Sequence, residues 1–140
     1  MYPTDKNRSD TELAIEWAFK QGMEKVLLLG ALGGRMGHLL GHCAILARYP
    51  DRVALIDEHL FLQAVNSGHR IVLHMDTNDR ISIFAVSGDP QLKTKGLKYE
   101  LNDERLEFAT HGLDNLAVQN ECSIQVRDGF ILLCVEKENP

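Results

Sequence analysis

Residues 25–38, KVLLLGALGGRMGH, decide the fold of the first half of this chain. The stretch opens with a short continuous apolar run, which is typical of a strand buried on both faces. Glycines and a single arginine follow. From Arg35 to about Arg48 the apolar residues recur at helical spacing. The stretch therefore predicts a buried strand, a tight turn and a helix whose apolar stripe contains Met36, Leu39, Leu40, Cys43, Ala44 and Ala47.

The turn between this strand and this helix has the composition of an anion site. Gly33 and Gly34 precede the helix, where unpaired amides and the helix dipole favour a negative charge, and Arg35 could add a bidentate phosphate contact. The spacing matches neither the P-loop nor the dinucleotide fingerprint. The alternative is that the glycines only permit a sharp turn and that Arg35 is solvated. Both interpretations remain open on the residues alone.

The helix contains two glycines and two histidines at four-residue spacing. Gly37 costs about 1 kcal/mol relative to alanine inside a helix, so Gly37 and Gly41 suggest that another element approaches closely. His38 and His42 could both face a metal. Because no third ligand is in view, we prefer a polar helix face for the two histidines.

The neighbouring segments complete an α/β pattern. Residues 9–22 predict a helix that starts with a Ser9 and Glu12 capping box. Residues 52–57, RVALID, predict a second buried strand, whereas HLFLQAV at residues 59–65 fits either a strand or a helix. Two helices and two or three strands make a thin layer, and a parallel sheet needs both faces covered. We therefore expect that another chain completes this sheet, or that the polypeptide is the later part of a larger protein.

The second half changes to short apolar runs separated by polar turns. Strands are expected in the runs RIVLHM, RISIFAV, LKYEL, LAVQ, CSIQV and FILLCVE, with NDE among the separators. Asp128-Gly129 between the last two runs predicts a two-residue hairpin. The fold class is thus an α/β lobe with an incomplete parallel sheet at residues 1–67, followed by an antiparallel β-sandwich or barrel-like sheet at residues 68–140.

Composition narrows the function classes. The chain has 140 residues, 44% of them hydrophobic, and a formal net charge of −5, so a nonspecific grip on nucleic acid is not expected. No run has the length of a membrane span, and the N-terminus has no apolar leader. Cys43 and Cys134 lie in apolar runs and are expected to be buried thiols, which suits a cytoplasmic protein.

Two further segments are candidates for chemistry. Asp5 and Asp10 flank the start of the first helix, and clustered carboxylates near a polyphosphate are what Mg²⁺ prefers. The alternative is that Ser9 caps this helix and Asp10 interacts with its dipole. The second segment is HGLDN at residues 111–115, a polar turn in which glycine and asparagine tolerate positive φ.

The order of these motifs resembles the thiamine pyrophosphokinase family from about residue 3 to residue 135. The motifs are D-x-x-x-[ST]-D at the start of a helix, a strand followed by G-x-x-G-G-R-x-x-H, then G-L-K-[WY]-x-L, then G-x-x-N before a final hairpin. The most specific are GALGGRMGH and GLKYELN. The resemblance implies a Mg²⁺-dependent homodimeric enzyme that transfers the pyrophosphoryl group of ATP to thiamine, which gives thiamine diphosphate and AMP.

The resemblance also implies roles for individual residues. Asp5 and Asp10 would bind the metal or the substrate and act in catalysis with Arg35. Gly33, Gly34, Arg35 and His38 would form the nucleotide turn. Asn115 would correspond to the asparagine of a Ser-Asn pair at the thiamine pocket, with Asp114 in place of the serine.

Four features depart from the family pattern, three of them on the metal and nucleotide side and one at the thiamine pocket. A preceding α/β segment with an acidic G-D-x-D-S motif is absent from this sequence, Asn7 occupies a position that is usually acidic, and Gly37 replaces the aspartate of G-G-R-x-D-H. Asp114 is the fourth departure. Two alternatives to catalysis therefore stay open: a non-catalytic protein that binds thiamine or nucleotide, and a dimerisation module.

Overall fold

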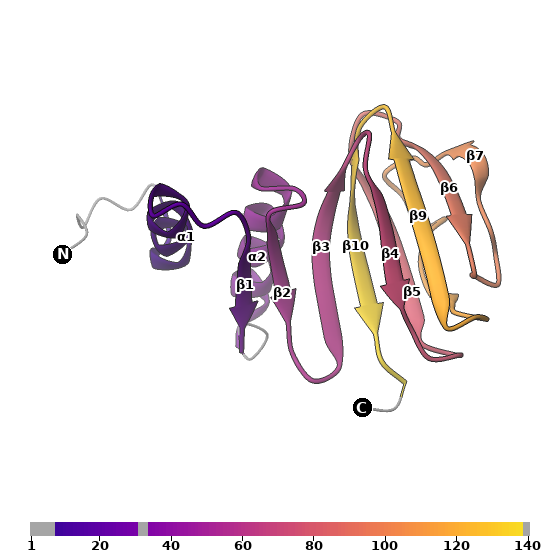
Figure 1. Cartoon of the computed structure of the whole chain (residues 1–140), viewed down its shortest axis with the longest axis horizontal. Coiled ribbons are helices and arrows are strands. Elements are labelled where there is room, and N and C mark those ends of the chain that lie inside the picture. Colours follow the sequence, from indigo (N-terminus) through magenta and orange to yellow (C-terminus); the bar gives the residue numbers. More distant parts are fainter. Residues whose placement is uncertain (1–7, 31–33, 139–140) are drawn as a thin grey trace.

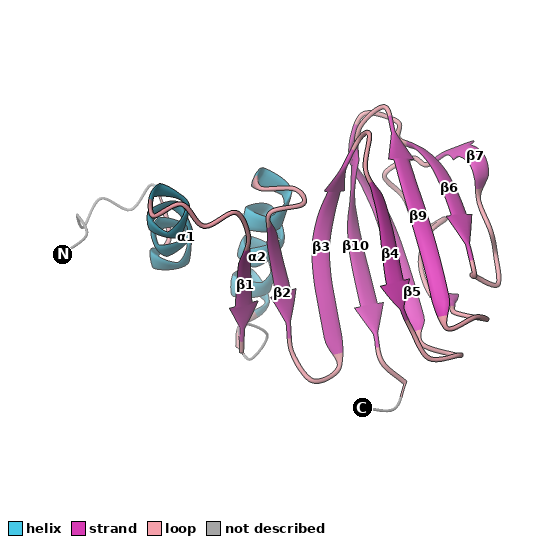
Figure 2. Ribbon diagram, viewed as in Figure 1, coloured by secondary structure: helices cyan, strands magenta, loops and turns pink. Residues whose placement is uncertain are grey.

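A computed structural model describes residues 8–30 and 34–138 of the chain. Two helices and ten strands follow one another in this part. Figure 1 shows the helical region at one end and the two packed sheets at the other, and Figure 2 shows both helices beside β1 and β2. The first five elements are α1 (Asp10–Lys20), β1 (Val26–Leu29), α2 (Met36–Arg48), β2 (Val53–Ile56) and β3 (Leu60–Asn66). The others are β4 (Arg70–His74), β5 (Arg80–Ser87), β6 (Gln91–Lys95), β7 (Asn102–Arg105), β8 (Asn115–Leu116), β9 (Glu121–Arg127) and β10 (Phe130–Glu136).

One mixed sheet runs through most of the molecule. Its strand order is β1-β2-β3-β10-β5-β8, and a second sheet has the order β4-β9-β6-β7. Only the β1–β2 pair is parallel among the described strands, since β3 pairs antiparallel with both β2 and β10. The fold class of an α/β lobe followed by a β-sandwich is confirmed. The ambiguous segment before residue 66 is strand β3. The division after residue 67 lies in the β3–β4 turn and stays a prediction.

Two cores hold the fold together. The larger lies between the sheets of the sandwich and contains fully buried side chains from both, such as Ile83 and Leu133 from one and Leu92 and Ile124 from the other. The smaller lies between the helices and the first strands, where Ile15 of α1 and Leu46 of α2 are buried. The capping box prediction is confirmed in part, because the Ser9 side chain accepts a hydrogen bond from the amide of Glu12.

The prediction that the first strand is buried on both faces is wrong. In β1 the side chains alternate, so that Leu27 and Leu29 are 59% and 75% exposed while Val26 and Leu28 pack toward the helices. Both helices that are described cover the same face of the sheet. The apolar stripe expected on α2 is also only partly buried, because Met36 and Leu40 are exposed by 69% and 62%. A continuous apolar run thus predicted burial on both faces for a strand that the described helices cover on one face.

Three predictions about the second half need correction. Asp128-Gly129 does link β9 to β10, with φ of 60° and 137°, but the two strands pair with other partners and lie in different sheets. The turn is a corner of the sandwich and no hairpin. LKYEL is no strand beyond a single bridge at Leu97, whereas the expected separator NDE begins β7. The LAVQ strand shortens to Leu116 together with Asn115 before it.

The cysteines also differ from the prediction. The fully buried thiol is Cys122, which donates a hydrogen bond to the carbonyl of Gly96, whereas Cys43 and Cys134 are half-buried. All three are free. Burial raises the pKa of Cys134 to about 11. None of the described helices is both long and apolar enough to cross a bilayer.

Candidate functional site

The N-terminus of α2 follows directly from the C-terminal end of β1. Arg35 is the cap residue, with extended backbone and no hydrogen bond from its side chain to the helix. The first turn of α2 contains no acidic side chain. Gly34 has a φ of +145°, which favours glycine there. Gly34, Arg35 and His38 are exposed, and Gly33 lies outside the described residues. The first amides of α2 and the Arg35 guanidinium are thus available to an anion.

Gly37 occupies open space in the first turn of α2. A Cβ atom built on Gly37 has no heavy atom within 4 Å, and the same holds for Gly41. The prediction that these glycines permit the close approach of another element is therefore wrong among the described residues. An aspartate would fit at position 37 without a clash, as the family motif G-G-R-x-D-H requires.

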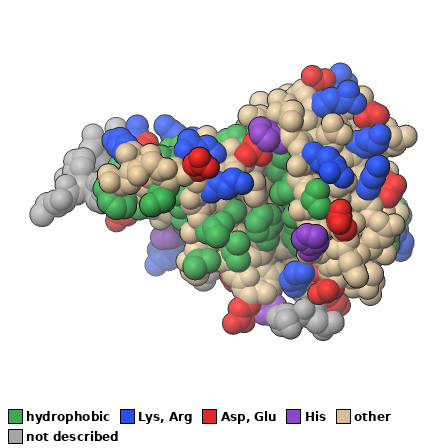
Figure 3. Space-filling view, in the orientation of Figure 1, with side chains coloured by type: hydrophobic (Ala, Val, Ile, Leu, Met, Phe, Trp, Pro, Cys, Tyr) green, Lys and Arg blue, Asp and Glu red, His purple; other side chains and the backbone are tan. Residues whose placement is uncertain are grey.

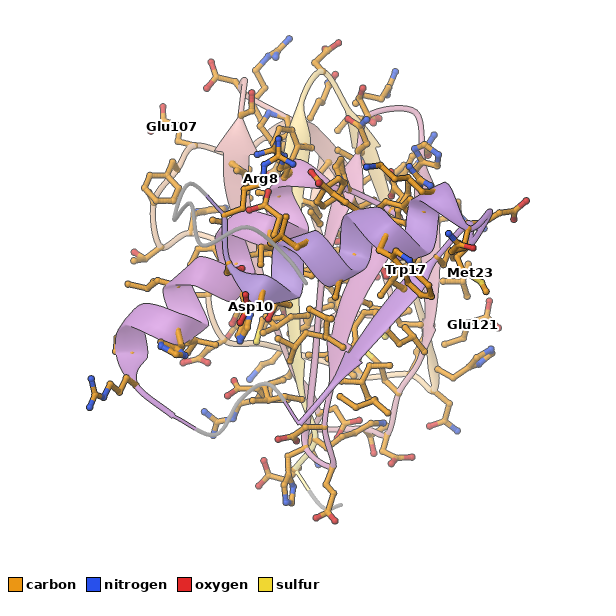
Figure 4. All side chains as sticks on the ribbon, turned by 90° about the vertical axis from the view of Figure 1, so that its left-hand side faces the viewer. Arg8, Asp10, Trp17, Met23, Glu107 and Glu121 are labelled. Carbon is orange, nitrogen blue, oxygen red and sulfur yellow. The ribbon has the colours of Figure 1, made fainter. Side chains whose placement is uncertain are left out.

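Only one member of the predicted acidic pair lies among the described residues. Asp5 lies outside the described residues, while Asp10 is the exposed first residue of α1. Figure 4 shows Asp10 and Arg8 at the same end of α1, with Trp17 and Met23 toward the other end. The Glu12 carboxylate forms a 3.0 Å ion pair with Arg48 at the C-terminal end of α2.

The contacts between the helices keep Asp10 apart from Arg35. Two side chains of α1 contact the C-terminal end of α2: Glu12 pairs with Arg48, and Glu16 accepts a hydrogen bond of 3.4 Å from the Tyr49 hydroxyl. Arg35 caps the opposite end of this 13-residue helix, about 20 Å away at 1.5 Å per residue. No contact recorded for the described residues joins Asp10 to Arg35.

Asn115 holds the backbone of a neighbouring loop. Its side chain is 8% exposed, and its Oδ1 atom accepts hydrogen bonds from the amides of Tyr99 at 3.0 Å and Leu116 at 2.9 Å. Its Nδ2 atom donates to the Tyr99 carbonyl at 2.7 Å. The amide group is therefore largely occupied by backbone. Asn115 fixes the position of Tyr99, whose ring is 64% exposed and has the Lys98 ammonium 5.4 Å from its centroid.

Asp114 directs its carboxylate toward solvent. Its φ is 55°, its amide donates to the hydroxyl of Ser82 at 3.0 Å, and its side chain is 56% exposed. The Arg80 guanidinium lies 4.0 Å from the carboxylate. The backbone of Gly112 lies so close to β5 that a Cβ atom built on Gly112 would lie 2.3 Å from the Ile83 carbonyl oxygen. Ser82 and Gly112 thus set the position of this loop, yet the RISIFAV pattern around Ser82 gave no indication of that role.

The two candidate regions lie at opposite edges of one sheet. Arg35 follows β1 at one edge, and Asp114 and Asn115 lie at β8, which is the other edge. Five strand intervals separate β1 from β8 in the order of the sheet, which is about 24 Å at 4.8 Å per interval. A nucleotide at Arg35 and a ligand at Asp114 of the same copy would therefore not meet.

A metal cluster is not evident within residues 8–30 and 34–138. Three or more His, Cys, Asp or Glu side chains suited to one ion do not gather there. The preference for a polar face at the two histidines holds for His38, which is exposed, but the Nδ1 atom of His42 is buried without a hydrogen-bond partner in this part of the chain.

Comparisons with known proteins converge on one family. The model of the thiamin pyrophosphokinase catalytic domain matches residues 1–57, and the model of the thiamin pyrophosphokinase vitamin B1 binding domain matches residues 68–131. The chain is 26% identical over 125 residues to thiamine pyrophosphokinase of Bacillus subtilis. The aligned region covers 86% of this chain and 56% of that protein. The chain is 31% identical over 90 residues to thiamine pyrophosphokinase 1 of Arabidopsis thaliana, which covers 60% of this chain and 33% of that protein.

Solved structures give the same picture for the fold. The crystal structure of thiamine pyrophosphokinase from Bacillus subtilis matches with a TM-score of 0.84 at 24% identity, over 96% of this chain and 65% of that chain. Thiamin pyrophosphokinase from Geobacillus thermodenitrificans matches with a TM-score of 0.81 at 24% identity, over 99% of this chain and 66% of that chain. The chain thus spans between a third and two thirds of the length of these relatives.

Proposed function

We propose that this chain, which belongs to the thiamine pyrophosphokinase family, takes part in the transfer of the pyrophosphoryl group of ATP to the hydroxyl of thiamine. The observation that carries the proposal is the uncapped start of α2. There Arg35 is exposed directly after a strand, and no acidic side chain occupies the first turn. Free amides and a guanidinium are the groups that bind phosphate oxygens.

The reaction depends mainly on position and charge. The oxygen of the thiamine hydroxyl forms a bond to the β-phosphorus of ATP, and the bond from that phosphorus to the oxygen bridging it to the α-phosphorus breaks. The electron pair leaves with AMP, and the hydroxyl proton passes to a base. In this proposal Gly33, Gly34, Arg35 and His38 hold the phosphates and offset their charge.

Mg²⁺ is the cofactor that this chemistry implies. When bound, it would neutralise phosphate charge, and hard carboxylate oxygens are its preferred protein ligands. Asp10 has the chemistry for this, because its carboxylate is exposed and has no ion-pair partner within the part of the chain that the structure describes, but no recorded contact brings it to Arg35 of the same copy. Asp5 would be the second carboxylate. The open space around Gly37 is where the family's aspartate would otherwise lie.

The thiamine side of the site would include the loop at the far edge of the sheet. Asn115 would act by fixing the Tyr99 backbone, and Asp114 offers a half-exposed carboxylate to the cationic thiazolium ring. Because about 24 Å separates this loop from β1 in one chain, both reactants could meet only if two copies share a site. We therefore propose that the protein is a homodimer. We also propose that it acts in the cytoplasm.

The direct test is an assay of product. The purified chain is incubated with ATP, Mg²⁺ and thiamine, and AMP and thiamine diphosphate are separated and measured. We expect both products in equal amounts and a loss of at least about a hundredfold in kcat/KM for Arg35→Ala, because a phosphate-binding guanidinium is removed. Lys20→Ala removes an exposed cation at the far end of α1 and should have no effect. A folded chain that forms neither product would remove the catalytic proposal.

A mixing experiment tests the shared site. Arg35→Ala and Asp114→Ala chains, each impaired alone, are denatured together, refolded and assayed at a thiamine concentration well below the KM of the Asp114→Ala chain. In a two-fold symmetric dimer each mixed pair has one site with both defects and one intact site, so about a quarter of the wild-type activity should return. Sedimentation measures the dimer independently. A monomer at assay concentration, or no recovery from mixed dimers, would contradict the shared site.

Asp114 favours a second candidate function, which is binding of thiamine without catalysis. A carboxylate attracts the thiazolium cation more strongly than the neutral serine of the family motif does, although Arg80 at 4.0 Å offsets part of its charge. Calorimetric titration with thiamine should then show about tenfold weaker binding for Asp114→Asn, and stronger binding for Arg80→Gln. Unchanged affinity in both variants would argue against this role.

A further inference from the structure

A shallow hollow lies on the outer face of the four-stranded sheet. It is open to solvent and is lined by Arg70, Lys93, Lys95, Ser123 and Gln125. These residues come from the three adjacent strands β4, β9 and β6. Figure 3 shows Lys and Arg side chains gathered on this side of the sandwich. The hollow is therefore a site of positive charge built on neighbouring strands.

The strand register places the charges side by side. Arg70 and Lys93 lie on either side of Gln125, since both are its register partners. Lys95 lies beside Ser123 in the next row of the same face. Opposite Cβ atoms in an antiparallel pair are about 5 Å apart. The three cationic side chains thus start within about 12 Å of one another, around two neutral hydrogen-bonding groups.

These three cations have no ion-pair partner among the described residues, in contrast to their neighbours. Arg127 pairs with Asp103 at 2.7 Å, and Arg105 pairs with Asp128 at 3.7 Å, both at the edge of the same sheet. The nearest acidic residue along β9 is Glu121, which has His74 as its register partner. No acidic side chain of the described residues lines the hollow, although Glu121 lies on the same face of β9 two residues beyond Ser123.

The platform under the hollow is rigid. Leu92, Ile124 and Val126 alternate with the lining residues along β6 and β9, and all three are completely buried in the core of the sandwich. Like charges on adjacent strands repel one another. A chain with a formal net charge of −5 that keeps three unpaired cations together on a fixed surface gains from an anion that bridges them.

We propose that this hollow binds a small anion with two adjacent phosphoryl groups. The three cations lie in two rows of the sheet face, and a diphosphate offers one phosphoryl group to each row. The Ser123 hydroxyl and the Gln125 amide supply neutral donors between the charges. The acidic overall charge disfavours a long nucleic acid on this surface. The site belongs to a different sheet from the turn at Arg35 and does not depend on the proposed transfer reaction.

Inorganic pyrophosphate is the probe that tests the site. Calorimetric titration without Mg²⁺ and at constant ionic strength should give saturable binding by the wild-type chain. We expect the double variant Lys93→Gln/Lys95→Gln to bind at least about tenfold more weakly, because two charge-assisted contacts are lost. The matched control, Lys20→Gln/Lys25→Gln, loses the same charge on the N-terminal lobe and should bind like the wild type. Arg35→Gln should also bind normally at this site.

Amide chemical shifts locate the bound anion. Pyrophosphate should shift the amides of Ser123 and Gln125 in the wild type and in Arg35→Gln. Saturable binding that is unaffected by the Lys93→Gln/Lys95→Gln changes would overturn the proposal, as would equal weakening in the control variant or the absence of binding. Should the double variant melt without cooperativity, Arg70→Gln, which alters a different strand, provides the same comparison. Orthophosphate should bind more weakly than pyrophosphate, and equal affinities would contradict the two-phosphoryl assignment.

Discussion

The two ends of the six-stranded sheet differ in how their apolar side chains are buried. At β10 the side chains of Ile131 and Leu133 are completely buried between two sheets. At β1 the sheet has helices on one face only, and Leu29 on the other face is 75% exposed. β10 also has strands on both sides, whereas β1 is an edge in the described part of the chain. Apolar runs of similar sequence therefore contribute differently to the stability of the fold, according to the layers that cover them.

Truncation of one leucine at each end gives the largest contrast. Leu133→Ala should lower the free energy of unfolding by about 3 kcal/mol, because a completely buried leucine leaves a cavity in the sandwich. Leu29→Ala should change it by less than about 0.5 kcal/mol, because its side chain is mostly in water. Urea unfolding of both variants measures this. Equal losses would mean that the face of β1 is covered in solution.

The buried Asp79 forms polar contacts that link the C-terminal segment to the sandwich, and its substitution tests their contribution to stability. Asp79 is completely buried, its carboxylate lies 2.9 Å from the Lys137 ammonium, and it accepts amide hydrogen bonds from Asp76 and Glu138. Asp79→Asn should cost about 2 kcal/mol at pH 7, since a partly exposed lysine loses its partner. Urea unfolding measures the loss, and Lys137→Met should cost at least as much, because it leaves the completely buried Asp79 carboxylate without its counter-charge.

The same contact predicts a pH dependence. Burial raises the pKa of Asp79, but hydrogen bonds and the charge from Lys137, with the amides of Asp76 and Glu138, lower it overall below its ordinary value. The carboxylate is therefore easier to ionise in the folded state, and its stabilisation is complete above the unfolded pKa of about 3.9. It is lost as the pH falls through the folded pKa. The gap between wild type and Asp79→Asn should close below about pH 4. A gap that stays constant to pH 2 would contradict the ion pair.

Gly37→Asp tests whether a carboxylate in the first turn of α2 stabilises the helix and binds Mg²⁺ with ATP. The position has open space around it, so an aspartate causes no clash. It should stabilise the chain by about 1 kcal/mol, through higher helix propensity and a favourable interaction with the N-terminus of α2. Gly37→Asn separates the charge from the propensity. Thermal melting gives the stability, and titration with Mg²⁺ and ATP should show tighter binding for the aspartate alone. No gain for aspartate over asparagine in that titration would remove the assignment of a missing carboxylate.

Hydrogen exchange gives the smallest perturbation, since it requires no substitution. The amides of β10, which pair on both sides, should exchange at least about a hundredfold more slowly than the outer amides of β1. Mass spectrometry of deuterated peptides resolves the two strands. Comparable protection in both would show that the two ends open as one unit.

Much of the fold could be predicted from local patterns. Ser9 and Glu12 mark the start of α1, the helical spacing after Arg35 marks α2, and the short runs separated by polar turns mark the strands of the sandwich. These features depend on neighbours within a few residues. Pairing does not, which is why Asp128-Gly129 was mistaken for a hairpin although each strand bonds to a different sheet.

The candidate site divides in the same way. The glycine turn and Arg35 were found from the sequence because a strand, two glycines and a helix start are contiguous. The hydrogen bonds between the Asn115 side chain and the Tyr99 backbone could not be found in this way, because the two residues lie 16 positions apart. The hollow at Arg70, Lys93 and Lys95 was missed for the same reason, because its charges come from three strands.

Local sequence patterns were enough to predict the family resemblance, most of the helices and strands, and the departures at Gly37 and Asp114, whereas the strand expected at LKYEL is absent and β7 begins in NDE. The tertiary structure alone decided which face of β1 is covered, which strands pair, and that the nucleotide turn and the Asp114 loop lie at opposite edges of one sheet. The physical reason is range. Propensity and capping act over one or two turns of chain, whereas burial and strand pairing depend on segments that only the folded chain brings together.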